Sequence, residues 1–252
     1  MKISPILTTI VCLIFLSCSK SKNGTNNPTG TQFTCGTILT VTHTAGSVAP
    51  VTKTVKYGTV SSSLSGTSKC WLTQNLGADH PATTFNDSSR ASAGWYFQFN
   101  RKQGYVSSVD TATDILGYKY YQYLLTPASA WVSQINESAD WQSANDPCTL
   151  LLGTGWRLPT QLEIKTVLAN GGWTTGDAAY GSIFNFHSSY LNTDTTYNTS
   201  YSLDYGAGYF WSSNQHDASS GWALYLTDAS NEVNNIESPN KKNAYPIRCI
   251  KD

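Results

Sequence analysis

The chain is poor in charged residues, which argues against several classes of partner. Charged residues make up 13% of 252 residues, and the 16 acidic side chains balance the 16 basic ones. About a quarter is usual in globular domains, and proteins that bind nucleic acid or anionic membranes carry an excess of Lys and Arg. The composition therefore argues against a nucleic-acid partner, and it is typical of an exported β-rich domain with uncharged loops.

The chain also lacks the short motifs that organise catalytic and metal sites. It has no Cys-x-x-Cys pair, no His-Glu-x-x-His motif, no Gly-x-Ser-x-Gly elbow and no phosphate-binding loop. Its histidines stand at no spacing typical of metal ligands: His43, His80, His187 and His216. The sparse acids form no recognisable glycosidase pair: Asp140, Asp146, Asp204 and Asp228. We therefore expect no cofactor, no metal and no catalysis, and a glycan-active enzyme is the less favoured alternative.

Long hydrophobic runs are absent except near the N-terminus. Residues 6–16 form an apolar run behind Lys2, which is too short to span a bilayer and is typical of an export signal. The string Phe15-Leu16-Ser17-Cys18 resembles the cleavage box of bacterial lipoproteins, although Phe15 stands where leucine is usual. We expect a lipid on Cys18 and an outer-membrane location. The alternative is an ordinary secretory signal in which Cys18 is incidental.

Behind Cys18 the chain is polar and has too little apolar surface to fold. Residues 19–34 are small and polar, which predicts a flexible tether. Residues 19–22, Ser-Lys-Ser-Lys, lack the acidic run that often directs such lipoproteins outward, which favours the periplasmic face over the cell surface. We divide the chain into a signal peptide at 1–17, a tether at 18–34 and one domain at 35–252.

Six cysteines occur, and Cys12 and Cys18 belong to the signal segment. The remaining four allow three pairings in an oxidising compartment. We predict the disulfides Cys35–Cys70 and Cys148–Cys249, the second of which would tie the middle of the domain to its last strand. The alternative is four buried free thiols.

Alternating apolar and polar residues predict several strands. The early strands are expected at 38–43, 51–57, 70–76 and 94–99, the first two as a hairpin. A short helix or turn is expected at 137–145. The last quarter predicts an antiparallel meander of strands at 209–213, 221–227, 232–237 and 244–250.

The clearest helix is predicted at Gln161–Ala169. Thr160 and Glu163 stand at the spacing of a capping box, in which each side chain accepts a hydrogen bond from the other residue's backbone amide. Its buried stripe would consist of Ile164, Val167 and Leu168. Residues 170–172, Asn-Gly-Gly, would end the helix because glycine accepts the left-handed conformation found there.

Four blocks in fixed order, followed by Arg248-Cys249, resemble a known family. The blocks are Cys70–Leu76, Gly94–Phe99, Gly155–Glu163 and Tyr209–Ser213. Together they resemble the Fibrobacter succinogenes major paralogous domain, which is common in Bacteroidetes-type envelope proteins. The resemblance covers residues 36–252.

The resemblance implies an α+β fold of the C-type-lectin-like kind, related to formylglycine-generating domains. Such a fold packs short helices on twisted antiparallel sheets and brings the two chain ends together. Glu237-Ser-Pro-Asn240 and Trp211-Ser-Ser-Asn214 come nearest to the calcium motifs of sugar-binding lectins, but their spacing and order differ. We therefore predict no calcium site. Cys148 and Cys249 are expected to be disulfide partners, which argues against formylglycine-generating activity.

The large aromatic residues have both a structural and a ligand-binding interpretation. Trp156 and Leu158 are expected in the core, with Arg157 paired to an acid or a carbonyl. Core positions are also favoured for three other tryptophans, Trp71, Trp211 and Trp222, because buried indole area stabilises a core and the N–H needs only one partner.

A long insert at 185–208 is the best candidate for a ligand loop. Tyrosine provides flat contact area at low entropy cost, and small polar neighbours provide adaptable hydrogen bonds. The candidate ligand residues are Tyr190, Tyr197, Tyr201, Tyr205 and, on a neighbouring strand, Trp222. The chain is thus expected to be a non-catalytic envelope lipoprotein that binds a glycan or a protein. The alternative is a structural surface component with a packed loop and no ligand.

Overall fold

The structure is a computed structural model that describes residues 33–252 except 88, 108–111, 114–118, 121–124, 189–206 and 230–233. The folded unit is Thr34–Asp252. It is mixed α and β, with mostly antiparallel sheets, short helices and two disulfides. The predicted signal peptide, the lipidation residue Cys18 and nearly all of the tether lie outside the described residues.

The unit begins with a hairpin, as the alternating pattern predicts. Strands β1 (Leu39–His43) and β2 (Lys53–Tyr57) pair antiparallel, with Leu39 opposite Tyr57 and His43 opposite Lys53. His43, Val55 and Tyr57 are buried, whereas Thr40, Thr42, Thr54 and Lys56 are exposed.

A second sheet joins the two ends of the folded unit. Its order is β10–β15–β4–β3, from strands β10 (Trp156–Arg157), β15 (Ile250–Lys251), β4 (Lys69–Leu72) and β3 (Thr59–Ser62). Cys70 on β4 lies opposite Lys251 on β15, and the Cys35–Cys70 disulfide ties the start of the unit to the same strand. The ends of the folded unit therefore meet at β4.

The aromatic segment at 94–99 forms a core strand, as predicted. Strand β5 (Tyr96–Gln98) is buried throughout and belongs to a sheet of order β14–β5–β6–β9. Its partners are β14 (Ala244–Pro246), β6 (Gly104–Ser107) and β9 (Leu125–Thr126). Between β6 and β9 in the sequence, two short strands form a separate two-stranded sheet: β7 (Ala112–Thr113) and β8 (Lys119–Tyr120).

The predicted meander is correct for its first strands and wrong for its last. Strands β11 (Ala207–Gln215), β12 (Gly221–Thr227) and β13 (Asn235–Glu237) pair in sequence order. The segment 244–250 instead leaves this sheet, since β14 pairs with β5 and β15 lies between β10 and β4. Alternation identifies strands but not their partners, and here the Cys148–Cys249 disulfide holds the chain at the other sheet.

The predicted helix is present as α3 (Gln161–Gly171), two residues longer than expected. Its capping box is complete: Thr160 Oγ1 accepts from the Glu163 amide and Glu163 Oε2 accepts from the Thr160 amide. Gly172 follows in the left-handed conformation, at φ 62°.

The remaining helices are short. They are α1 (Arg90–Ala93), α2 (Pro147–Leu152), α4 (Gly176–Tyr180), η1 (Ala128–Ala130) and η2 (Ser143–Asn145). Of the segment predicted as a helix or turn at 137–145, the last three residues form η2 and the rest is irregular.

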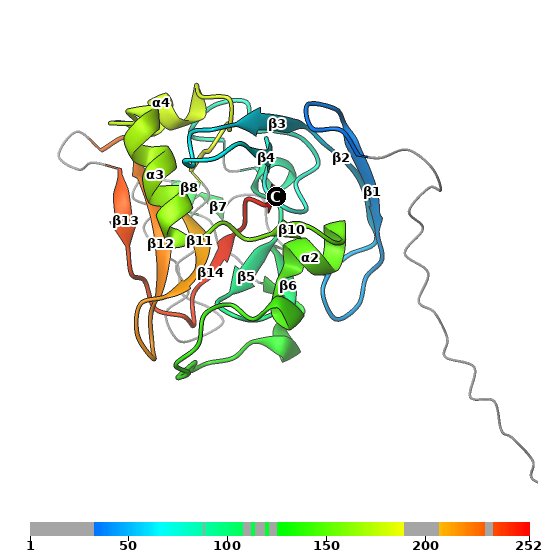
Figure 1. Ribbon diagram of the computed structural model, residues 1–252. Coiled ribbons are helices and arrows are strands. Elements are labelled where there is room, and N and C mark those ends of the chain that lie inside the picture. Colours follow the sequence, from blue (N-terminus) through cyan, green and yellow to red (C-terminus); the bar gives the residue numbers. More distant parts are fainter. Residues whose placement is uncertain are drawn as a thin grey trace, which may run out of the picture. The chain divides into compact units, whose positions relative to one another are not determined.

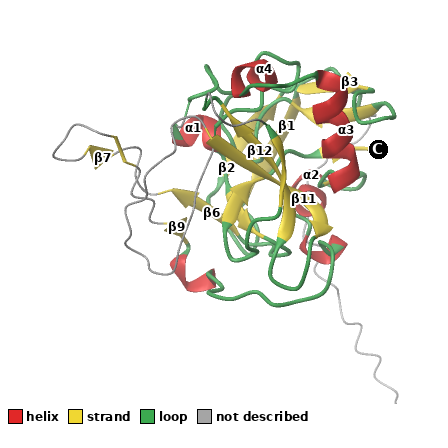
Figure 2. Cartoon of the chain, turned by 90° about the vertical axis from the view of Figure 1, so that its left-hand side faces the viewer, coloured by secondary structure: helices red, strands yellow, loops and turns green. Residues whose placement is uncertain are grey.

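The main core lies between α3 and the sheet of β11, β12 and β13. Ile164 and Val167 of α3 are buried there, and Leu168 is partly buried beside them. They pack with sheet residues Phe210, Leu224 and Leu226, among others. In Figure 1 helix α3 lies in front of β11 and β12, and in Figure 2 it lies to one side of the same strands. This packing fixes the sheet that carries the candidate site.

The segment 155–163 has a structural role: it contributes core side chains and a salt-bridged arginine, as predicted. Trp156 and Leu158 are buried, at 3% and 1% exposure. Arg157 donates to both oxygens of Glu163 at 2.8 and 2.7 Å, and to both oxygens of Asp252 at 3.0 and 2.8 Å. It thereby joins the start of α3 to the residue that follows β15.

Candidate functional site

Strand β11 carries a bulge that turns part of it toward the start of α3. Trp211 lies opposite Ala223 on β12, but Gln215 lies opposite Gly221, so Ser212–Asn214 face the single residue Trp222. Bulges bend a strand and re-aim its side chains, and they are frequent beside functional sites. This bulge and Trp222 form the candidate site.

Hydrogen bonds to neighbouring segments hold the bulge in place. The Ser213 amide donates to Pro159 O at 2.8 Å, and Ser213 O accepts from the Trp141 amide at 2.7 Å. Asn214 Oδ1 accepts from the Gln161 amide at 2.9 Å, at the first residue of α3. The bulge is therefore fixed both to the helix start and to the irregular segment that contains Trp141.

A carboxylate from that same segment supports the bulge. Asp140 Oδ2 accepts from Asn214 Nδ2 at 3.0 Å, and Asp140 Oδ1 accepts from the Gln215 amide at 2.9 Å. Asp140 is exposed, so its free lone pairs face solvent beside the Asn214 amide. An amide and a carboxylate thus stand next to each other on the surface.

Trp222 is half-buried and lies on β12, opposite the bulge. Its ring and the His216 ring form a T-shaped pair, with centroids 4.5 Å apart and an interplanar angle of 81°. Among the described residues its indole N–H has no hydrogen-bond partner, and it is not among the buried unpartnered atoms. Solvent therefore reaches this donor, which leaves it available to a ligand.

His216 is itself held in place by the β11–β12 turn. Its Nδ1 lies 3.1 Å from both Asp217 Oδ2 and Ser220 Oγ. Hydrogen bonds from the Ser220 side chain and from the amides of Ser219 and Ser220 hold the pKa of Asp217 well below its usual range. The turn therefore presents an ionised carboxylate beside an ordered imidazole, and that imidazole packs on the Trp222 ring.

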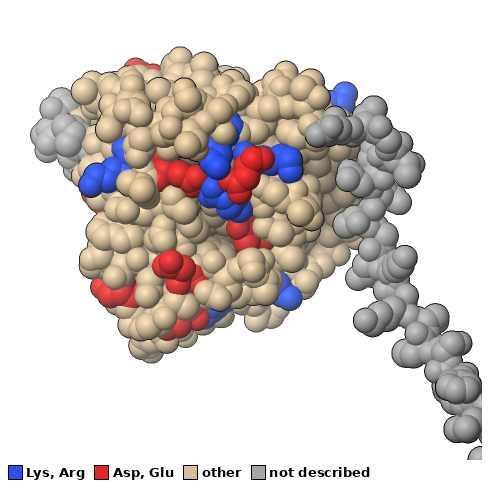
Figure 3. Space-filling view, viewed as in Figure 1, with Lys and Arg blue, Asp and Glu red and all other residues tan. Residues whose placement is uncertain are grey.

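These groups offer the chemistry of ligand recognition. A partly exposed indole offers a flat apolar face, and the nearby amide, imidazole and carboxylates offer donors and acceptors. Within the described part of the chain, no group of three His, Cys, Asp or Glu residues could hold a metal ion. Figure 3 shows one face of the molecule, on which acidic and basic side chains gather near the centre and most of the remaining surface is uncharged.

The predicted ligand residues are only partly accounted for. Tyr190, Tyr197, Tyr201 and Tyr205 lie outside the described residues. Trp222 is described and is half-buried, so the prediction that it belongs to the core is only partly right. The same prediction is confirmed for Trp71 and Trp211, which are 0% exposed.

Sequence reasoning missed Asp140, Asn214 and His216 as members of one surface. The predicted strand ended at Ser213, whereas β11 continues to Gln215 through the bulge. A bulge has no periodic signature, and Asp140 reaches Asn214 across 74 residues of sequence. The adjacent pair of His216 and Asp217 was a weak signal, since such pairs are usually solvated loop residues.

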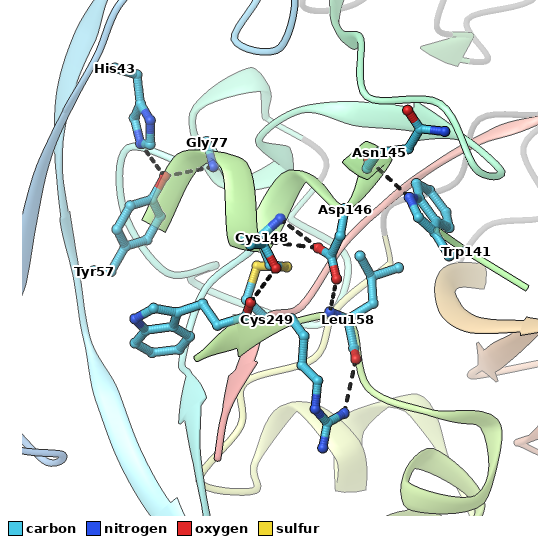
Figure 4. Close-up of a disulfide and its surroundings, with 12 residues drawn as sticks. His43, Tyr57, Gly77, Trp141, Asn145, Asp146, Cys148, Leu158 and Cys249 are labelled. Carbon is cyan, nitrogen blue, oxygen red and sulfur yellow. Dashed lines mark hydrogen bonds between the residues drawn. A yellow bond between two sulfur atoms is a disulfide. The ribbon is translucent and has the colours of Figure 1, made fainter. Parts of the chain in front are cut away.

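The Cys148–Cys249 disulfide lies in a closed interior (Figure 4). Both cysteines are 0% exposed. Beside them Asp146 Oδ1 accepts from the Cys148 amide at 2.8 Å and Oδ2 from the Leu158 amide at 3.0 Å. Burial raises the pKa of Asp146, and the backbone donors oppose that rise. A substrate could not reach these sulfur atoms without local unfolding, so the pair is structural.

Comparisons with known proteins do not assign this chain to a group. No family model, curated protein or solved structure matches it. In the described residues, no helix has the length and apolar character needed to cross a membrane. The resemblance to the Fibrobacter succinogenes domain and its lectin-like fold therefore stay predictions.

Proposed function

We propose that this chain is a non-catalytic envelope module that binds a glycan through the surface around Trp222. The observation that carries the proposal is the half-buried indole with a solvent-reachable N–H, set against His216 on a bulge that hydrogen bonds hold in place. The predicted family and C-type-lectin-like fold belong to the same proposal, and the antiparallel sheets with short helices support them.

The surface fits a glycan because sugar rings present both apolar and polar groups. The C–H face of a sugar can lie on an indole ring, while its hydroxyls exchange hydrogen bonds with an amide and a carboxylate. Asn214, on the bulge opposite Trp222, and its hydrogen-bond partner Asp140 supply those groups. Because the bulge is already ordered, little conformational entropy is lost when a ligand binds.

A peptide partner is the second candidate for the same surface. Aromatic side chains with small polar neighbours also serve protein recognition. The favoured ligand is a glycan because the bulge opposite this single indole carries polar groups that hydrogen bonds hold in place, whereas protein contacts are centred on larger apolar clusters. A structural component without a ligand would leave the Trp222 surface without a role.

A glycan array followed by affinity measurement tests the proposal. We expect binding to a restricted set of glycans, and Trp222→Ala should weaken it at least tenfold, which corresponds to about 1.4 kcal/mol. Trp131→Ala is a matched control, because it removes another half-buried indole, one that packs on Tyr105 away from the bulge contacts. Equal affinity of the Trp222 variant and the native chain would refute the site.

The glycan array and a capture experiment with envelope extracts together separate the three interpretations of the surface. A protein captured from envelope extracts in a Trp222-dependent way, with no glycan bound, would favour the peptide alternative. No ligand of either kind at saturating concentrations would favour a structural component.

The membrane anchor is a separate part of the proposal. We propose that Cys18 carries the lipid and that residues 18–34 tether the folded unit to the outer membrane, facing the periplasm. Mass spectrometry of the N-terminal peptide should show a diacylglycerol adduct in the native chain, and Cys18→Ala should lack it and leave the membrane fraction. An unmodified Cys18 in a membrane-free native chain would overturn the anchor without affecting the ligand surface.

A further inference from the structure

Asn100 lies in the turn that follows β5 and has the left-handed backbone conformation. Its φ is 53°, and the Arg101 amide closes the turn by donating to Gln98 O at 3.0 Å. Residues other than glycine rarely adopt this conformation, although asparagine tolerates it better than most. Asn100 is also 4% exposed. An uncommon backbone conformation that carries a buried polar side chain points to a specific task for that side chain.

The Asn100 side chain binds the irregular segment 137–145 at three places. Its Nδ2 donates to Glu137 Oε1 at 2.8 Å. Its Oδ1 accepts from the Gln142 amide at 2.9 Å and from Asn145 Nδ2 at 3.2 Å. A carboxamide provides both the donor that a carboxylate needs and the acceptor that a backbone N–H needs. One buried side chain therefore fixes both ends of this segment.

Neighbouring residues reinforce this attachment. The rings of Phe99 and Trp141 are in contact, with centroids 5.2 Å apart. Arg101 Nη1 donates to both carboxylate oxygens of Glu137 at 3.1 Å, and Lys241 Nζ donates to Glu137 O at 2.6 Å. The segment thus rests on the turn after β5, which is itself a buried strand.

The segment held by Asn100 carries two residues that hold the bulge in place. Asp140 accepts hydrogen bonds from Asn214 and Gln215, and the Trp141 amide donates to the bulge as well. The segment is largely exposed and irregular, so its order depends on side-chain contacts more than on a ladder of backbone hydrogen bonds. Asn100 is therefore linked to the bulge through these two residues.

We propose that Asn100 is a positioning residue of the Trp222 surface, because it holds the segment 137–145 in the conformation that presents Asp140 to a ligand. The inference rests on the proposed function, since a positioning role requires a ligand. When only part of the population has the competent conformation, the apparent affinity falls in proportion to that part. Asn100 thereby contributes to affinity from inside the fold.

Asn100→Gly tests this role because it removes the side chain and keeps the backbone conformation. Glycine adopts a positive φ without strain, so the turn after β5 still forms. We expect the affinity for the glycan selected by the array to fall about tenfold, as it does when the competent conformation drops to about a tenth of the population. The affinity is measured well below the unfolding midpoint, so that unfolded chain does not contribute. Native affinity in Asn100→Gly would overturn the proposal.

Asn234→Gly is the matched control. Asn234 is also a buried asparagine whose side chain joins two segments, since its Oδ1 accepts from the Thr227 amide at 2.8 Å and its Nδ2 donates to Trp173 O at 3.1 Å. Thr227 lies at the end of β12 far from Trp222. This variant should lose stability and keep the native glycan affinity. An equal loss of affinity in the two variants would show a general effect of destabilisation and would contradict the proposal.

Hydrogen exchange of single amides gives a result that does not depend on a ligand. The amides of Trp141 and Gln215 donate to Ser213 O and to Asp140 Oδ1, and in Asn100→Gly both should exchange about tenfold faster. Native protection of both amides in that variant would overturn the proposal.

The same measurement separates this inference from the proposed function. A native chain that binds no glycan, together with faster exchange in Asn100→Gly, would refute the proposed function and confirm Asn100 as the residue that orders the segment.

Discussion

At the scale of single residues, one buried hydrogen-bond chain depends on the protonation state of His43. The Gly77 amide donates to Tyr57 Oη at 2.9 Å, so the Tyr57 hydroxyl can give its proton to His43 Nε2, 2.8 Å away (Figure 4). This arrangement requires a neutral imidazole. Burial, and then the charge of Lys53, lowers the pKa of His43 to about 4.

The His43 pKa predicts that acid weakens the fold. A histidine whose folded pKa is about 4 and whose unfolded pKa is 6.5 binds its proton only after unfolding between those values. Stability is therefore complete above pH 6.5 and falls as the pH drops toward 4. At pH 5 the loss from His43 is about 2 kcal/mol.

Urea unfolding at pH 7 and pH 5 measures this effect. The native chain should lose about 2 kcal/mol more between the two conditions than His43→Phe does. Carboxylates contribute equally to both proteins, so they cancel in the comparison. The same pH dependence in both would show that His43 is not held neutral.

At the scale of elements, sequence patterns predicted α3 and the early hairpin because their signals are local. The capping box of Thr160 and Glu163 and the glycine end of α3 follow from residue spacing alone. The bulge at Ser212–Asn214 could not be predicted, because it depends on contacts with Pro159 and Asp140 from elsewhere in the chain. The predicted strand partners of 244–250 were wrong because strand pairing, too, depends on residues distant in the sequence.

The capping box of α3 predicts a measurable contribution to stability. Thr160→Ala leaves the Glu163 amide without its acceptor, and the loss of such a cap costs about 1 kcal/mol. Thr166→Ala is the matched control, since Thr166 lies inside the same helix and its hydroxyl bonds only to Leu162 O. Its effect on the free energy of unfolding should be a few tenths of a kcal/mol. Equal losses in the two variants would contradict the role of the cap.

At the scale of the whole molecule, the two disulfides close the unit at different points. Both predicted pairs are present. Cys148–Cys249 spans 101 residues of sequence and is fully buried, whereas Cys35–Cys70 spans 35 residues and joins the first residues of the unit to β4. The cysteine count left three pairings open, of which the observed one is the pairing that we predicted, and nothing in the sequence linked Asp140 to Asn214 on the bulge.

The lengths of the two closed loops predict that the disulfides contribute unequally to the free energy of unfolding. Removing Cys148–Cys249 as a double alanine variant should cost about 4–5 kcal/mol, and removing Cys35–Cys70 about 1 kcal/mol less. Cavities left by the fully buried sulfurs widen the difference. Urea unfolding of the two double variants measures it, and a larger loss from the Cys35–Cys70 variant would contradict the account.

The most direct test of a glycan-binding surface is nuclear magnetic resonance of the tryptophan side chains. The chain has 8 tryptophans, and labelling their indole nitrogens with ¹⁵N makes each N–H visible. The signal that disappears in Trp222→Phe is assigned to the half-buried Trp222 indole. On titration with the glycan selected by the array, the account predicts a saturable shift of the Trp222 signal, while those of buried Trp71 and Trp211 stay in place. A bound glycan that leaves the Trp222 signal unmoved would show that the ligand surface lies elsewhere.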